Sequence, residues 1–152
     1  MLDFDKITKI ISDGNIESKQ IDELLSRLVV NNDWLPIYLI SESVSREVSI
    51  LIDSEDNIWI DWGSIGEVTI NPPGGATLPF KLWLHTHPSN YAYWSLTDRN
   101  SLAISKGILD KAIVLGLNGM LSSTLDDNHE WSEEEVKSWF EVLLNLGDEL
   151  DG

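Results

Sequence analysis

The run FKLWLHTH, residues 80–87, constrains the fold of this chain more than any other segment. It is mostly apolar, it has the length of one strand, and Pro88 follows it at once, which predicts a strand that stops there. Side chains at i and i+2 of a strand point to the same face, so His85 and His87 project together, on the side of Trp83. The chain has only three histidines. Two histidines on the same face at the end of a strand therefore predict that they share a function.

Two imidazoles that share a face can bind one small metal ion. Zinc accepts imidazole nitrogens and is usually tetrahedral, and a catalytic zinc takes three protein ligands and leaves the fourth position open. Asp98 is the best third candidate, because it falls in the first turn of a helix predicted over 95–108, where a carboxylate also complements the helix dipole. Ser95-x-x-Asp98 is also an acidic variant of the capping box, so a structural role for this pair stays open.

Helical periodicity recurs in four segments. The spacing of apolar residues predicts helices over 3–12, 16–30, 95–108 and 131–147. In the third, the candidate core contacts are Leu96, Leu102, Ile104 and Ile108. In the last, Ser132 fits the N-cap and Gly147 the end.

Strand patterns fill most of the space between these helices. They predict strands over 34–40, 46–53, 58–62, 67–71, 80–87, 111–117 and 120–125. Pro36 marks the first of these as an edge or interrupted strand. Asn118-Gly119 is a hairpin signal between the last two. We therefore expect an α+β fold, an α/β sandwich around one mixed sheet.

The length of 152 residues fits one domain, which we expect to span residues 1–152. Its expected parts are an N-terminal helical extension over 1–30, a core over 34–125 and the C-terminal helix. The absence of cysteine excludes disulfides and thiolate metal sites. No apolar run approaches 18 residues, and the N-terminus carries acids early, so we expect neither a membrane span nor a secretory signal, and a cytoplasmic location.

The charge is strongly negative, with 26 acidic and 10 basic residues and a formal net charge of −16. Such a surface repels phosphate backbones, which argues against a nucleic acid partner. It attracts basic partners, although solubility alone is an equally good explanation of the charge.

The motif around the histidines resembles a known family signature. HTHP at 85–88 is followed after six residues by Ser95, and after two more by Asp98. This resembles the JAMM signature of the MPN (JAB) zinc metalloprotease family, with the spacing matched in full. The resemblance covers roughly residues 34–125 and implies an MPN-like fold there.

The family pattern also has a glutamate on an upstream strand, typically before a short apolar run. Glu47, at the head of EVSILID, fits that place, and Glu42 is the alternative. The family often has a glycine within the run, where this chain has Ile50 near the corresponding position.

The resemblance implies that a Zn²⁺ ion is held by His85, His87 and Asp98, and that the reaction is hydrolysis of an amide bond. In this family the bond is often the isopeptide bond of a ubiquitin-like tail. Glu47 would accept a proton from the attacking water and pass it to the leaving amine. Ser95 would donate a hydrogen bond to the oxyanion.

The aromatic loop before Ser95 offers a candidate for substrate binding. Trp94 either lines the groove for an extended substrate or anchors the loop. The expected partner is a protein with a ubiquitin-like, sulfur-carrier-like or peptide tail, and with a basic surface. Two other functions stay open: a non-catalytic MPN scaffold that binds partners, and the DNA-repair-associated RadC-like branch, which carries a similar His-x-His-Pro and Ser-x-x-Asp pattern.

Overall fold

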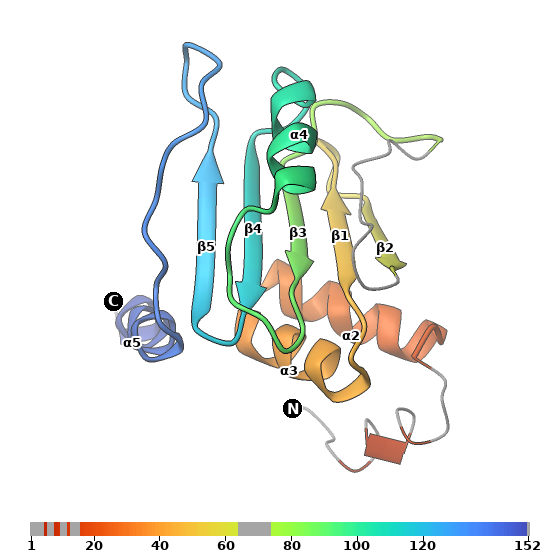
Figure 1. Ribbon diagram of the computed structural model, residues 1–152. Helices are drawn as coiled ribbons and strands as arrows, with labels where there is room; N and C mark the ends of the chain where they lie inside the picture. Colours follow the sequence, from red (N-terminus) through yellow and green to blue (C-terminus); the bar gives the residue numbers. More distant parts are fainter. Residues whose placement is uncertain (1–4, 6–7, 10–11, 13–15, 64–73, 152) are drawn as a thin grey trace.

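The computed structural model describes residues 5, 8–9, 12, 16–63 and 74–151. Within these residues a five-stranded mixed sheet, in the order β2-β1-β3-β4-β5, lies between layers of helices (Figure 1). The strands are β1 (Val48–Ile52), β2 (Ile58–Trp62), β3 (Leu82–Thr86), β4 (Lys111–Gly116) and β5 (Gly119–Thr124). The helices are α2 (Lys19–Val30), α3 (Trp34–Val44), α4 (Leu96–Ile104) and α5 (Trp139–Asp151). The expected α+β class is confirmed.

The strand pairing places β3 in the middle of the sheet. β1 is antiparallel to both β2 and β3, and β4 and β5 form the predicted antiparallel hairpin. β3 and β4 are parallel, so the chain must cross over between them, and α4 is that crossover. In the resulting register His85 lies between Ser49 of β1 and Val114 of β4.

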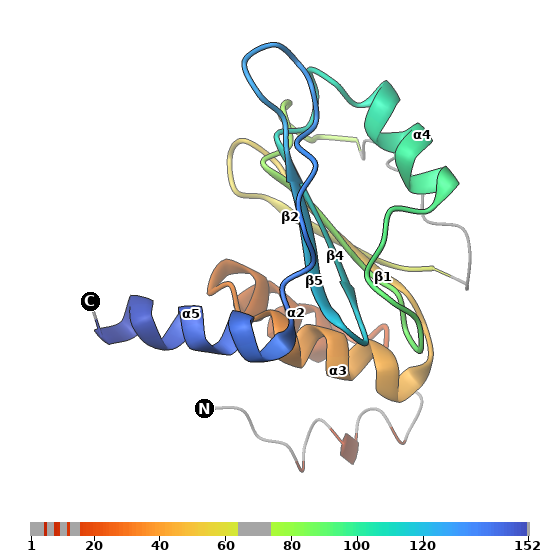
Figure 2. The same cartoon turned by 60° about the vertical axis from the view of Figure 1, so that its left-hand side comes forward.

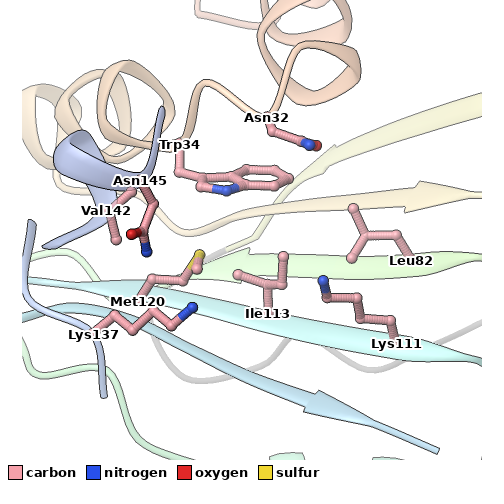
Figure 3. A pocket seen from close by; sticks show the side chains of 9 residues that line it. All are labelled: Asn32, Trp34, Leu82, Lys111, Ile113, Met120, Lys137, Val142 and Asn145. Carbon is pink, nitrogen blue, oxygen red and sulfur yellow. The ribbon is translucent and has the colours of Figure 1, made fainter. Parts of the chain in front are cut away.

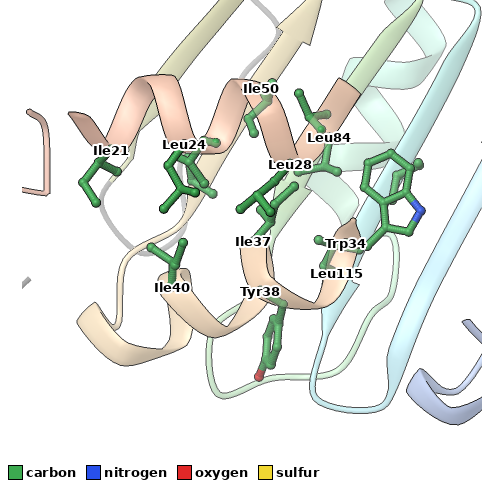
Figure 4. Packing of buried hydrophobic residues seen from close by; sticks show 14 of the residues in the cluster. Ile21, Leu24, Leu28, Trp34, Ile37, Tyr38, Ile40, Ile50, Leu84 and Leu115 are labelled. Carbon is green, nitrogen blue, oxygen red and sulfur yellow. The ribbon is translucent and has the colours of Figure 1, made fainter. Parts of the chain in front are cut away.

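The alternation of β3 divides the core between the two faces of the sheet. Leu82 and Leu84 pack against α2 and α3, whose apolar stripes cover one face (Figure 4). Trp83 and His85 point to the opposite face. Figure 2 shows that α4 lies over this face. α5 contributes Val142 to the same side as α2 and α3. The predicted helix over 16–30 is therefore confirmed as α2, and it forms part of the main core.

The strand predicted over 34–40 is wrong, because this segment belongs to α3. Pro36 is the third residue of the helix, in the first turn, where backbone N–H groups have no intrahelical acceptor and proline costs little. Four-residue spacing then buries Ile37 and Ser41 toward the core. The helix ends at Val44, and its C-cap, Ser45, has a left-handed φ of 52°.

The helix predicted over 131–147 has both ends wrong, since α5 runs from Trp139 to Asp151. Ser132 does not cap it. Its hydroxyl accepts a hydrogen bond from the Thr124 N–H, and the chain from 131 to 137 runs along the edge strand β5. The unpaired backbone groups of that edge hold the segment extended. Ser138 accepts from the Glu141 N–H at 3.2 Å and caps the helix instead.

Two predicted core contacts of α4 are wrong: Leu96 and Ile104 are 77% and 78% exposed, whereas Leu102 is buried. The strand predicted over 67–71 and most of the helix predicted over 3–12 lie outside the described residues. Among the described helices, none has both the length and the apolar character that crossing a membrane would require.

Candidate metal centre

The structure brings His85, His87 and Asp98 together on the α4 side of the sheet. Their potential ligand atoms all lie within 4.8 Å of one another, and all three residues are buried. Asp98 Oδ2 lies 3.2 Å from His85 Nε2 and 3.5 Å from His87 Nε2. The strand supplies the histidines and the first turn of α4 supplies the carboxylate.

The tautomer of His87 follows from its second ring nitrogen. Nδ1 lies 3.0 Å from the Tyr91 carbonyl oxygen, which can only accept, so Nδ1 carries the hydrogen. In the neutral ring, Nε2 then directs its lone pair toward the Asp98 carboxylate. Burial lowers the pKa of His87, but the Asp98 carboxylate and the Tyr91 carbonyl outweigh it and raise that pKa. A proton or a metal ion between Nε2 and Oδ2 therefore stabilises this arrangement.

His85 lies in a more apolar environment. Its ring stacks on Trp83 with a centroid distance of 4.4 Å, and burial lowers its pKa despite the nearby Asp98 carboxylate. Both of its ring nitrogens are buried without a hydrogen-bond partner among the described residues. Nε2 is close to Asp98 Oδ2, but not in a hydrogen-bonding orientation. A buried polar atom without a hydrogen-bond partner lowers the stability of the fold unless another group binds to it.

Asp98 has two simultaneous tasks. In a reciprocal capping box, its Oδ2 accepts from the Ser95 N–H and the Ser95 hydroxyl accepts from the Asp98 N–H, both at 3.0 Å. Burial raises the pKa of Asp98, but the two imidazoles and the Ser95 N–H hold it well below its usual range. The capping box and the metal interpretation are therefore compatible. The cap fixes the carboxylate that faces the histidines.

The donor set fits a metal ion. Ligand atoms that share a tetrahedral zinc at 2.0–2.1 Å lie roughly 3.4 Å apart, close to the two nitrogen–oxygen distances in this group. In the neutral rings, one of the two unpartnered nitrogens of His85 and Nε2 of His87 each carry a lone pair that a metal ion can accept. His85, His87 and Asp98 thus form a buried group that can hold a metal ion.

Glu47 lies beside this group. Its carbonyl accepts from the Gly63 N–H, so the ladder between β1 and β2 continues through it. It is two residues before Ser49, the partner of His85, which places it on the same face as the histidines. Its negative charge contributes to the raised pKa of His87. Glu47 is half-buried.

Glu42, the alternative glutamate, lies on α3 and is engaged elsewhere. Its carboxylate accepts from the hydroxyls of Tyr38 and Ser89 at 2.6 Å and from the Ser89 N–H. The hydrogen bonds from Ser89, followed by that from Tyr38, lower the pKa of Glu42. This carboxylate ties α3 to the loop that follows Pro88. The geometry therefore favours Glu47 over Glu42, because Glu47 shares the sheet face of the histidines and acts electrostatically on His87.

Trp94 connects the centre to a cavity. Its ring lies 6.0 Å from that of His85, and it lines a cavity of about 650 Å³ between α4 and the extended segment 131–136. Arg99 of α4 and Trp131 of the segment both line this space. The volume of this cavity lies within the usual range of ligand sites, and aromatic residues beside the centre line it.

Sequence reasoning missed several neighbours of the histidines. Ser49 accepts a hydrogen bond from the Trp83 indole at 3.0 Å, which fixes the ring that stacks on His85. Tyr93 packs edge-on against His87 at 5.0 Å. Trp83 itself was predicted on this face from the alternation of β3. The Tyr91 carbonyl carries no sequence signal, because every residue has one.

Comparison of the chain with protein-family models, with curated proteins and with solved structures gives no significant match.

Proposed function

We propose that this protein is a zinc-dependent hydrolase of amide bonds, similar to the JAMM-type metalloproteases. The observation that carries the proposal is the buried group of His85, His87 and Asp98, which has Glu47 on the same sheet face. Three protein ligands and a nearby carboxylate are the composition expected of a catalytic zinc site.

The chain's own residues have separate roles in this proposal. A zinc ion bound by His85, His87 and Asp98 would supply Lewis acidity, lowering the pKa of a bound water to about 7. Glu47 accepts a proton from the attacking water and transfers it to the leaving amine. The Ser95 hydroxyl, which accepts in the capping box, keeps its own hydrogen to donate to the oxyanion.

The substrate class comes from the resemblance to the JAMM-type metalloproteases, and the surroundings of the centre are compatible with it. Trp94 and the cavity beside it would hold an extended peptide next to the ligands. The expected substrate is a protein joined through an isopeptide or peptide bond to a ubiquitin-like tail. A net charge of −16 favours a substrate with a basic surface.

The test is Glu47→Gln, which keeps the size of the side chain and removes the proton acceptor. We expect zinc content near one ion per chain, by elemental analysis of untagged protein, in both forms. Hydrolysis of a fluorogenic amide at the tail of a ubiquitin-like protein should fall by about 100-fold or more in the variant.

Glu141→Gln is the matched control, because Glu141 is exposed on α5, on the opposite side of the sheet. Its turnover should equal that of the wild type. Glu42→Gln tests the alternative base, and we expect a much smaller loss than for Glu47→Gln. If the wild type cleaves the amide and neither Glu42 nor Glu47 matters, the proposed mechanism is wrong. Failure to take up zinc would exclude the metal site itself.

A further inference from the structure

A second cavity, of about 270 Å³, lies on the sheet face opposite the candidate metal centre (Figure 3). Apolar side chains form the floor of this cavity, and polar side chains lie at its edges. The lining residues come from the turn between α2 and α3 (Asn32, Trp34), from the sheet and the segment beside it (Leu82, Lys111, Ile113, Met120, Lys137) and from α5 (Val142, Asn145).

The backbone determines that both lysines face this cavity. Lys111 is two residues before Ile113 on β4, and Ile113 belongs to the core between the sheet and α2 and α3. Lys137 exchanges two backbone hydrogen bonds with Met120 of β5, so their side chains share a face. The alternation of the strands thus directs two ammonium groups to a face that is otherwise used for packing.

Neither ammonium has an acidic partner in the described part of the chain. The basic side chains that form ion pairs there, apart from the site histidines, are Arg46, Lys81 and Lys106. With 26 acidic residues against 10 basic ones, acidic partners are abundant. Two lysines that share one cavity without a described carboxylate therefore point to an external anion.

We propose that this cavity binds a small organic anion: one apolar ring with a single acidic group, carboxylate or phosphate. The ring packs between the Trp34 indole and Val142, where the lining is apolar. The acidic group lies toward Lys111 and Lys137, and the Asn145 amide adds a donor. A volume of about 270 Å³ is at the small end of ligand sites, which limits the ligand to one ring. This site does not depend on the metal centre.

The experiment titrates the full chain with phenyl phosphate, benzoate and neutral benzyl alcohol at low salt, and follows the Trp34 indole N–H signal by NMR. Trp34→Phe identifies that signal among those of the seven tryptophans. We expect saturable shifts with an anionic probe and much weaker ones with the alcohol. Saturation by phenyl phosphate alone identifies a phosphate site, and saturation by benzoate alone identifies a carboxylate site.

The variants are Lys111→Gln and Lys137→Gln, each expected to weaken binding of the anion by roughly tenfold, the scale of one charge-assisted hydrogen bond. Both lysines are exposed, so the fold should persist, and circular dichroism checks this. The matched control is Lys81→Gln, because Lys81 pairs with Asp56 away from the cavity. Equal binding of the alcohol and the anions, no saturation, or unchanged binding by both variants would overturn the proposal.

Discussion

At the residue scale, the two histidines of the candidate centre lie in different surroundings although they share one face of β3. His85 is enclosed by aromatic rings, and burial lowers its pKa. His87 is fixed by the Tyr91 carbonyl and faces Asp98, which raises its pKa. In the metal-free protein, His85 therefore stays neutral while His87 is the first of the two to take up a proton as pH falls.

This difference predicts the pH dependence of metal binding. Neutral imidazole is the ligand form, so a proton on His87 competes with the metal. Because the pKa of His87 is raised, zinc affinity should be full well above the ordinary histidine value of about 6.5 and should fall through and below that region. Competition titrations from pH 8 to pH 5 measure it. An affinity that stays flat over this range would contradict ligation by His85 and His87.

The capping box gives a second prediction at this scale. Ser95→Ala removes only the N-cap acceptor, so the free energy of unfolding should fall by about 1 kcal/mol while zinc content stays near wild type. Asp98→Ala removes the same box and also the carboxylate ligand, so zinc should be lost as well. Denaturant unfolding and elemental analysis separate the two variants. Equal zinc content in both would assign Asp98 a capping role alone.

At the scale of elements, the centre depends on how closely the loop after β3 approaches β4. A side chain at Gly116 would clash with the backbone of Tyr91 and Ala92. The Asn118 side chain accepts from the Ala92 N–H at 2.7 Å, and the Leu117 N–H donates to the Asn90 carbonyl at 2.8 Å. The end of β4 thus holds the loop whose carbonyl orients His87.

Gly116→Ala is therefore predicted to weaken metal binding without touching a ligand. The added methyl group meets backbone atoms, which cannot rotate away, so the loop must shift and the Tyr91 carbonyl shifts with it. Loss of such an orienting partner typically costs 10–100-fold in metal affinity. Competition titration with zinc measures the loss. Gly74→Ala is the control, because nothing lies within 4 Å of an added methyl group there.

At the scale of the whole molecule, the sheet separates two sites. The α4 face holds the candidate metal centre and the larger cavity, and the opposite face holds the smaller cavity. Figure 2 shows α4 on one side of the sheet and α2, α3 and α5 on the other. The net charge of −16 belongs to the whole chain and acts over distances longer than any single contact.

This charge predicts that capture of a basic substrate slows as salt is added. The attraction is screened within about 10 Å at 0.1 M ionic strength, so the association rate should fall steeply between low and physiological salt. Stopped-flow mixing with a lysine-rich substrate and with an otherwise identical neutral one measures the difference. The neutral substrate should show little dependence. A rate independent of salt for both would assign the charge to solubility alone.

Local patterns predicted most of the sheet and the three candidate metal ligands, His85, His87 and Asp98. The strands over 58–62, 80–87 and 111–117 follow from alternation or a buried apolar run, and the hairpin follows from Asn118-Gly119. Where two structures fit one local pattern, prediction failed. Pro36 suits either an edge strand or a first helical turn. Ser132 and Ser138 each precede a glutamate by three residues, and only the second caps a helix.

The sequence by itself determined that His85 and His87 share a face and that Ser95 and Asp98 begin a helix, because both features depend on neighbours within four residues. Tertiary structure alone decided that Asp98 faces the histidines, that Glu47 and not Glu42 lies beside them, and that Tyr91 supplies the orienting carbonyl. These contacts join separate elements. They form only when β1, β3, β4 and α4 pack together, so no local pattern encodes them.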